Sequence, residues 1–185
     1  MKQTYPALLR HKLTRMRSFM RIYHYRFLGM EIHPGSIVGK VNCKWPHKVT
    51  LGSNCHVEDS VFFKVTHPFS KDNFINIGDR VFIGSRCEFN CSTKIMVGND
   101  CLIAGNTTIV DTGHGMDRDM KINQQPVTCA EIIISDDVWI GANCVILKGV
   151  IIGKGSIIGA GSVVNKSIPE YQVWAGVPAR YIRNR

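Results

Sequence analysis

The sequence of 185 residues lacks several features typical of membrane-spanning or zinc-binding proteins. No apolar run approaches the roughly 20 residues that a membrane-spanning helix needs. The basic N-terminus has no uninterrupted apolar segment of the kind found in signal peptides. No C-x-x-C motif occurs, and no two of the seven histidines lie three to five residues apart, the usual spacing of a local zinc-chelating pair. We therefore expect a cytoplasmic protein without a metal site.

Acidic residues are absent from residues 1–30, which carry seven Lys and Arg side chains. The whole chain has a net charge of +9 and this arm alone +7, so only +2 remains for the other 155 residues. A nucleic-acid-binding protein would be expected to continue the basic surface with a groove or an aromatic platform in the rest of the chain. No such pattern follows the arm, and we expect no nucleic-acid partner.

The chain does contain a regular six-residue repeat. Residues 134–169 read ISDDVW, IGANCV, ILKGVI, IGKGSI, IGAGSV and VNKSIP. An aliphatic residue opens every block: Ile134, Ile140, Ile146, Ile152, Ile158 and Val164. This period fits neither a helix at 3.6 nor a strand at 2. It is typical of a parallel β-helix, in which three blocks close one triangular coil of 18 residues. Glycine at the second place of several blocks (Gly141, Gly153, Gly159) is expected to adopt corner conformations closed to residues with a Cβ.

The same phase extends toward the N-terminus and predicts an all-β domain of about five to six coils over residues 31–169. Coils start at Leu51, Ile77, Val97, Ile134 and Ile152, which are 26, 20, 37 and 18 residues apart. Relative to 18 residues, the first and third intervals are too long by 8 and 19. The sequence therefore predicts a short loop near Thr66–Asn73 and a long one near Gly115–Glu131.

Four of the seven cysteines share the fifth place of a block: Cys55, Cys87, Cys101 and Cys144. Val, Ser and Thr occupy that place elsewhere in the repeat. We interpret these thiols as small core residues in a reducing compartment, not as disulfide partners or ligands.

Residues from about Pro6 to Phe27 are predicted to form a helix. Their apolar stripe, spaced alternately by four and three residues, consists of Leu9, Leu13, Met16, Met20, Tyr23 and Phe27. Three roles stay open for this arm, residues 1–30. The helix could cap the open end of the column or pack on a neighbouring subunit. It could also bind an anionic membrane surface, and nucleic acid ranks last.

The candidate chemistry lies where the repeat is interrupted. His114 sits between two glycines at the root of the long loop, and the pKa of an imidazole suits proton transfer near neutrality. Beyond the last block, the tail 170–185 and Lys166 gather cations at one end of the column: Lys166, Arg180, Arg183 and Arg185. These cations could hold a phosphorylated ligand or only solubilise the tail.

The segments DDVWIGANCVILKGVIIGKGSIIGAGSVVNKSIP and AGVPARYIR resemble the hexapeptide-repeat acyltransferases, specifically the maltose, galactoside and capsule or O-antigen O-acetyltransferase group. This resemblance implies a left-handed β-helix, against the usual right-handed crossover of parallel strands. It also implies a homotrimer that binds acetyl-CoA, the acyl donor, in the groove between neighbouring prisms.

Thr112-Gly113-His114 matches the T-G-H of these enzymes, which implies that His114 is the general base. Trp139, in the matching V-W-I-G, is expected to line the thioester end of the site. The resemblance assigns other donor-binding positions to Ala142 and Ala160 beside the pantetheine arm, to Asn165 and Lys166 beside the adenosine, and to Arg180 and Arg183 near the phosphates.

The acceptor side departs from the sugar acetyltransferases. Gly84 stands where they have an asparagine and Ser92 where they have an aspartate, so we consider Asn90 and Asp111 as substrate-binding alternatives. We expect the acceptor to be a hydroxyl of a cell-surface saccharide or its lipid-linked precursor, the latter consistent with a membrane-facing arm. Open alternatives are an amino-sugar N-acetyltransferase, a non-catalytic scaffold, and a zinc-dependent hydratase.

Overall fold

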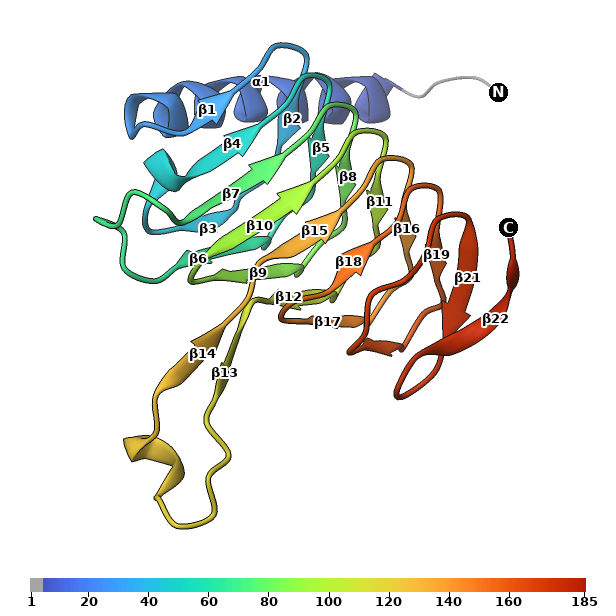
Figure 1. The fold of residues 1–185 in the computed structure, drawn as a ribbon. Coiled ribbons are helices and arrows are strands. Elements are labelled where there is room, and N and C mark those ends of the chain that lie inside the picture. Colours follow the sequence, from blue (N-terminus) through green and yellow to red (C-terminus); the bar gives the residue numbers. More distant parts are fainter. Residues whose placement is uncertain (1–4) are drawn as a thin grey trace.

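The computed structural model describes residues 5–185 as a left-handed parallel β-helix with one long helix packed on its first coil (Figure 1). Three parallel sheets form the sides of a triangular prism. Sheet A consists of β1 (Glu31–Ile32), β4 (Val49–Leu51), β7 (Phe74–Ile77), β10 (Lys94–Val97), β15 (Ile132–Ile134) and β18 (Ile151–Ile152). Sheet B contains β2 (Ile37–Val38), β5 (His56–Val57), β8 (Phe82–Ile83), β11 (Leu102–Ile103), β16 (Trp139–Ile140), β19 (Ile157–Ile158), β21 (Gln172–Ala175) and β22 (Arg180–Asn184). Sheet C consists of β3 (Asn42–Cys43), β6 (Phe62–Val65), β9 (Glu88–Cys91), β12 (Thr108–Val110), β17 (Val145–Leu147) and β20 (Val163–Val164).

The predicted phase of the repeat is confirmed. All six aliphatic residues that open the blocks of 134–169 are at most 1% exposed. Successive coils stack in register, so Ile140 lies between Ile103 of the preceding coil and Ile158 of the next. Each such side chain contributes roughly 1.5–3 kcal/mol through removal of apolar surface from water. The six complete coils agree with the predicted five to six.

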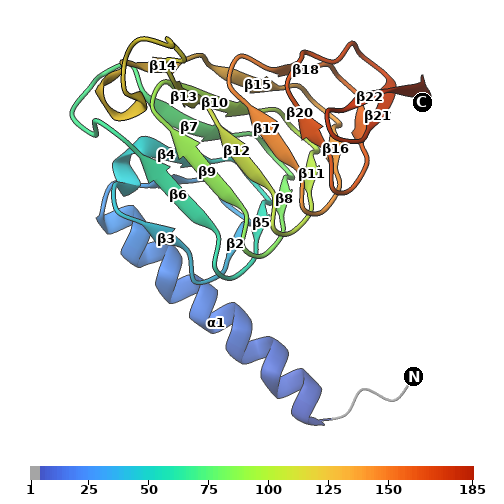
Figure 2. The same ribbon diagram turned by 90° about the horizontal axis from the view of Figure 1, so that it is seen from below.

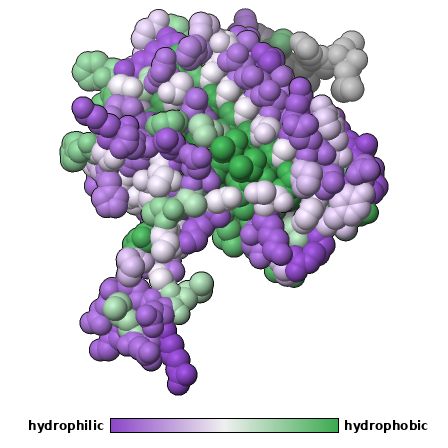
Figure 3. Space-filling view, viewed as in Figure 1, coloured by the Kyte–Doolittle hydropathy of each residue, from purple (hydrophilic) through white to green (hydrophobic). Residues whose placement is uncertain are grey.

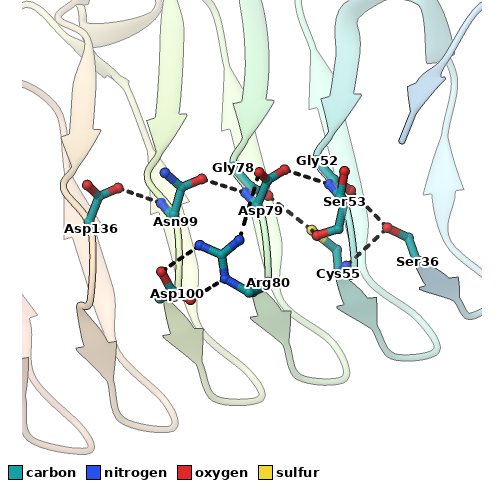
Figure 4. Close-up of polar contacts among 10 residues, drawn as sticks. All are labelled: Ser36, Gly52, Ser53, Cys55, Gly78, Asp79, Arg80, Asn99, Asp100 and Asp136. Atoms are coloured by element: carbon teal, nitrogen blue, oxygen red, sulfur yellow. Dashed lines mark hydrogen bonds and ion pairs between the residues drawn. The ribbon is translucent and has the colours of Figure 1, made fainter. Parts of the chain in front are cut away.

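The edge between sheets A and B shows how side chains support the turns (Figure 4). The Oδ1 atom of Asp79 accepts a hydrogen bond from the Ser53 N–H at 2.7 Å. Asn99 accepts one from the Asp79 N–H at 2.8 Å, and Asp136 accepts one from the Asn99 N–H at 2.6 Å. From the second coil to the fifth, a column of side-chain acceptors therefore caps the turn of the previous coil. Turn N–H groups that no strand satisfies obtain a partner in this way.

Glycine is needed at the second place of a block for a different reason from the one predicted. Gly141, Gly153 and Gly159 do not have positive φ angles; Asn143, one of the corner residues that does, has φ 58°. A Cβ at Gly141 would instead lie 2.5 Å from the backbone nitrogen of Ala160 in the next coil. These glycines allow close stacking of adjacent coils and do not supply a special backbone conformation.

The cysteine prediction is confirmed for the core positions. Cys55, Cys87, Cys101 and Cys144 are each at most 1% exposed, and no cysteine among residues 5–185 forms a disulfide. Burial raises the pKa of Cys87 and Cys101 to about 11. Because the thiolate is the reactive form, these thiols are chemically quiet.

The predicted helix is present as α1 (Tyr5–Phe27), and it packs on β1 and β2 of the first coil. Ile22 and Tyr25 pack against the hydrophobic core, and polar groups add hydrogen bonds. Ser18 Oγ accepts a hydrogen bond from the Val38 N–H at 2.8 Å, and the Tyr25 hydroxyl donates to the Val41 carbonyl at 3.0 Å. The guanidinium of Arg26 donates to the Ile32 carbonyl. The helix thus covers part of an open sheet edge, as a capping element must.

Both predicted loops leave the edge between sheets C and A. The short one spans residues 66–73, between β6 and β7. The long one is an antiparallel hairpin of β13 (Thr112–His114) and β14 (Val127–Cys129), with the 3₁₀ turn η2 (Ile122–Gln124) near its tip. Figure 1 shows this hairpin projecting away from the coils. A second 3₁₀ turn, η1 (Pro46–Lys48), joins β3 to β4.

The residues predicted as a tail continue the column. Ile168 bridges to Ile152, β21 pairs in parallel with β19, and β22 folds back antiparallel on β21. This partial coil closes the end opposite to α1. None of the helices within residues 5–185 combines the length and apolar character needed to span a bilayer.

Candidate active site

His114 lies outside the column on the hairpin. The chain leaves sheet C after β12, and His114 in β13 stands directly opposite Val127 in β14. Its side chain is exposed. An imidazole in this position can exchange protons with a bound molecule, which a core histidine could not do. The sequence located the interruption correctly, although it predicted a loop and not paired strands.

The two faces of the hairpin differ in their surroundings. Side chains alternate along a strand, so His114 and Thr112 share one face with their partners Val127 and Cys129. Gly113 and Thr128 occupy the other face. There Lys148, at the end of β17, donates a hydrogen bond to the Thr128 hydroxyl. A Cβ on Gly113 would lie 3.3 Å from the Lys148 side chain, so glycine lets this lysine pack against the strand that carries His114.

Asp111 fixes the root of the hairpin. It is 0% exposed, and its carboxylate accepts hydrogen bonds from the Ser92 N–H at 2.8 Å and the Thr93 N–H at 2.7 Å. The Thr93 hydroxyl donates to it as well, at 2.9 Å. A buried carboxylate with these partners is committed to the turn at residues 92–93. The geometry therefore favours a structural role for Asp111 over the predicted contact with an acceptor.

A groove of about 460 Å³ lies between the short loop and the root of the hairpin, and we call it the hairpin groove. Its polar lining comes from Ser70, Asp72, Asn73, Ser92, Thr93, Lys94 and Glu131. Cys129 also lines it, and Cys129 shares its hairpin face with His114. The groove therefore opens on the side of the hairpin where the imidazole stands. Asn90, the other predicted acceptor residue, points outward from sheet C and does not line this groove.

Trp139 lies on a different side of the prism from His114. It faces outward from β16 in sheet B, 51% exposed, in register with Leu102 and Ile157. Sheet B does not form the edge from which the hairpin leaves. One chain therefore does not bring the predicted base and the predicted tryptophan together.

Ala142 and Ala160 stack on each other at the edge between sheets B and C. The Gly161 N–H donates to the Ala142 carbonyl at 2.8 Å. The N–H groups of Ala142 and Ala160 themselves donate no hydrogen bond within residues 5–185, whereas the N–H groups of Gly141 and Gly161 do. Two neighbouring backbone donors at this edge are therefore available to a ligand.

The predicted donor-binding cations gather at the C-terminal end of the column. Asn165 and Lys166 are exposed at the edge between sheets C and A, on the last coil, and Arg180 and Arg183 are exposed on β22. No carboxylate within residues 5–185 forms an ion pair with Lys166, Arg180 or Arg183, whereas Arg185 pairs with Asp137 at 2.7 Å. Unpaired cations of this kind suit a phosphate group.

Residues 5–185 contain no cluster of three His, Cys, Asp or Glu side chains that could hold a metal ion. Of the functional candidates, Lys148 and the lining of the hairpin groove were not identified from the sequence. A lysine in a corner position of a repeat resembles any solvated side chain. Only the packing of the hairpin on its neighbouring coil reveals its contact.

Comparison with known proteins shows similarity over most of the chain. The family described as "Bacterial transferase hexapeptide (six repeats)" matches residues 131–166, and "Hexapeptide repeat of succinyl-transferase" matches residues 75–110. Galactoside O-acetyltransferase of Escherichia coli (strain K12) is 35% identical over 151 residues, which cover 82% of this chain and 71% of that protein. A putative lipopolysaccharide biosynthesis O-acetyl transferase of the same strain, WbbJ, is 36% identical over 62% of this chain and 59% of its own length. Among solved structures, the hexapeptide-repeat acetyltransferase VCA0836 of Vibrio cholerae O1 biovar eltor, complexed with acetyl coenzyme A, has a TM-score of 0.60 and 28% identity, covering 89% of this chain and 76% of that one.

Proposed function

The chain belongs to the hexapeptide-repeat acyltransferases, and from this premise we propose that it transfers an acetyl group from acetyl-CoA to a saccharide hydroxyl. The observation that carries the proposal is the exposed His114 on a hairpin whose root, at Cys129 on the same face, lines the polar hairpin groove. The names of the two relatives, both O-acetyltransferases, support the reaction class. The acetyl-CoA complex of the Vibrio protein supports the donor.

In the proposed reaction, His114 removes the proton of the acceptor hydroxyl as its oxygen attacks the thioester carbonyl. The tetrahedral intermediate then collapses and the C–S bond breaks. The imidazolium of His114 gives its proton to the departing thiolate of CoA. The unused N–H of Ala142 is the proposed donor to the negatively charged oxygen of this intermediate. Preorganised donors of this type stabilise charge that develops in the transition state.

The site we propose is shared between protomers of a homotrimer. In a cyclic trimer, each chain contacts its two neighbours through two different surfaces. Two rows of outward-facing apolar side chains, one on sheet B and one on sheet A, could form these surfaces. Leu102 and Trp139, both about half exposed, lie on sheet B. Met96, Ile133 and Ile151 lie in register on sheet A, where Figure 3 shows an apolar patch over β15 and β18, above the hairpin. Packing the first row of one protomer against the second row of the next would place Trp139 of one protomer near His114 of the other.

Acetyl-CoA is proposed to lie along the prism. The thioester would be at the hairpin, and the phosphates would lie near Lys166, Arg180 and Arg183. Ala160 would contact the pantetheine arm through its free N–H group, Ala142 would lie at the thioester end of that arm, and Asn165 would lie beside the adenosine. Coils stacked about 4.8 Å apart give an extended ligand a path parallel to the axis.

For the acceptor, we propose a hydroxyl of a cell-surface polysaccharide or of its lipid-linked precursor, modified in the cytoplasm. The hairpin groove supports this class because it presents hydroxyl, carboxylate and ammonium groups, which can bond to sugar hydroxyls. Gly84 and Ser92 stand where the galactoside and maltose enzymes carry larger polar residues, and this difference favours another saccharide.

The test is a CoA-release assay with purified protein, acetyl-CoA, and a panel of sugars, nucleotide sugars and oligosaccharides. We expect turnover with a hydroxyl acceptor and a loss of about 10²–10⁴-fold in kcat for His114→Ala. Asp119→Ala, at an exposed position of the same hairpin, is the matched control and should keep the parental kcat. Turnover confined to amino sugars would indicate N-acetylation. Failure to bind acetyl-CoA by calorimetry would indicate a scaffold and overturn the proposal.

A further inference from the structure

We propose that the outer face of helix α1 binds the surface of an anionic lipid bilayer and anchors the column there by its first coil. The apolar stripe of α1 is turned away from the column. The six residues of this outer stripe, Leu9, Leu13, Met16, Met20, Tyr23 and Phe27, are 38–88% exposed. The sequence identified the stripe correctly, but the side that packs on the column is the opposite one, around Ser18.

The opposite side of α1 is occupied by its contacts with the first coil. Ser18 is 3% exposed and accepts a hydrogen bond from Val38, and Tyr25 bonds to Val41. These contacts fix how the helix is rotated about its axis. Figure 2 shows the N-terminal half of α1 extending past the coils, so the column does not cover the outer stripe there. The stripe faces outward because the contacts of the helix with the column hold it in that rotation.

Basic side chains flank the outer stripe on both sides. At 100° per residue, Arg10 and Arg17 lie along one border, and Lys12 lies along the other. Residues 5–27 contain no acidic side chain. Arg21 is the one basic residue of α1 within ion-pair distance of a carboxylate among residues 5–185, at 3.8 Å from Asp59. Long basic side chains beside an apolar stripe can reach the headgroup layer while their stems stay near the acyl chains.

This charge pattern favours lipid over another copy of the chain. Two copies meeting through the stripe would bring their basic borders together without a single acid in either helix, and like charges in contact repel. An anionic bilayer supplies the missing negative charge, and each Lys or Arg near its surface strengthens the attraction to it. The helix does not have the apolar character to span a bilayer, so it would lie in the interface.

The experiment is co-sedimentation of the full-length protein with vesicles. We expect binding to vesicles that contain phosphatidylglycerol, little binding to phosphatidylcholine alone, and release by added salt. Met16→Glu with Met20→Glu should lower the partition coefficient about 100-fold, because it places charge in the stripe. Arg10→Glu with Arg17→Glu should weaken binding at least about 10-fold and shift the salt dependence.

Lys121→Glu with Lys154→Glu makes the same charge change at exposed positions of the hairpin and the last coil, and it should leave vesicle binding within about two-fold of the parent. The proposal is overturned if the parent does not bind phosphatidylglycerol vesicles, or if this control variant loses as much as the helix variants. It is also overturned if Met16→Glu with Met20→Glu dissociates the oligomer in light scattering, because the stripe would then be a subunit contact. Acetyl transfer is not measured, so this result is independent of the proposed enzymatic function.

Discussion

Two edges of the same prism differ in how much the lengths of their turns vary. At the edge between sheets A and B, every turn from the first to the sixth coil has four residues, and side chains such as Asp79 and Asn99 cap the preceding turn. At the edge between sheets C and A, the turns range from two residues (92–93) to the 21 residues of the hairpin segment (111–131). The regular edge builds the column, and the variable edge carries His114 and the hairpin groove.

The strongest contrast is between an inward and a projecting isoleucine. Ile140 is 0% exposed in sheet B, whereas Ile122 is 58% exposed on the hairpin. An unpaired buried charge costs several kcal/mol, comparable to the total stability of about 5–15 kcal/mol of a typical domain. We expect Ile140→Asp to abolish the cooperative thermal transition and Ile122→Asp to leave Tm nearly unchanged. Circular dichroism melts decide this, and equal melts for the two variants would show that the assignment of inward positions is wrong.

Thiol reactivity should show the same division. Cys129 is exposed on the hairpin, whereas Cys87, Cys91 and Cys101 are buried in the column. Burial raises the pKa of Cys91 to about 12 and that of the other two to about 11, so at pH 8 few of these thiols are ionised. Raising the pH toward 11 increases their thiolate fraction, but reaction still requires opening of the column. At pH 8 we expect Ellman's reagent to label Cys129 at least about 10³-fold faster than the three core thiols. Equal labelling rates in the native protein would contradict a closed core.

A third test compares two aspartates of the long segment. Asp111 is buried at its root and accepts hydrogen bonds from Ser92 and Thr93, whereas Asp119 is exposed near its tip. Removing the Asp111 carboxylate leaves buried N–H groups without a partner, which costs about 1–3 kcal/mol. We expect Asp111→Ala to lower the free energy of unfolding by this amount, measured in urea. Asp119→Ala should stay within about 0.5 kcal/mol of the parent. An unchanged stability in Asp111→Ala would remove its assigned structural role.

The smallest effect is expected at the cationic end. Lys166→Ala with Arg183→Ala removes two exposed cations that have no ion-pair partner within residues 5–185. If they contact the phosphates of CoA, KM for acetyl-CoA should rise about 10-fold with kcat little changed. The reason is that such a contact stabilises the bound substrate and the transition state equally. Steady-state kinetics provide the measurement. A rise in the acceptor KM with the donor KM unchanged would assign this end to the saccharide.

The sequence predicted the column well because its interior imposes a strict rule. Every sixth residue must be buried, and a slip of one position would expose the whole row, so phase alone located the strands, the core cysteines and both interruptions. The short loop at residues 66–73 was found in the same way, by counting residues in excess of a coil.

The parts that the sequence did not predict are those where such a rule is absent. The hairpin strands, Thr112–His114 and Val127–Cys129, contain no buried residue and are too short to show an alternating pattern. The apolar stripe of α1 was evident from the sequence. Periodicity shows which residues share a face of the helix, but it does not show whether that face packs on the column. Asp111 and Lys148 obtained their roles from contacts with residues 18 to 20 positions away in sequence, across adjacent coils.

The most direct test of the account removes the hairpin and keeps the column. Gly113 and Thr128 are paired directly opposite each other, so residues 114–127 can be replaced by the turn Asn-Gly, which favours a two-residue hairpin. We expect the shortened protein to melt within a few degrees of the parent while its kcat for acetyl transfer falls by about 10² or more. A shortened protein that still transfers acetyl groups at the parental rate would contradict the assignment of catalysis to the hairpin.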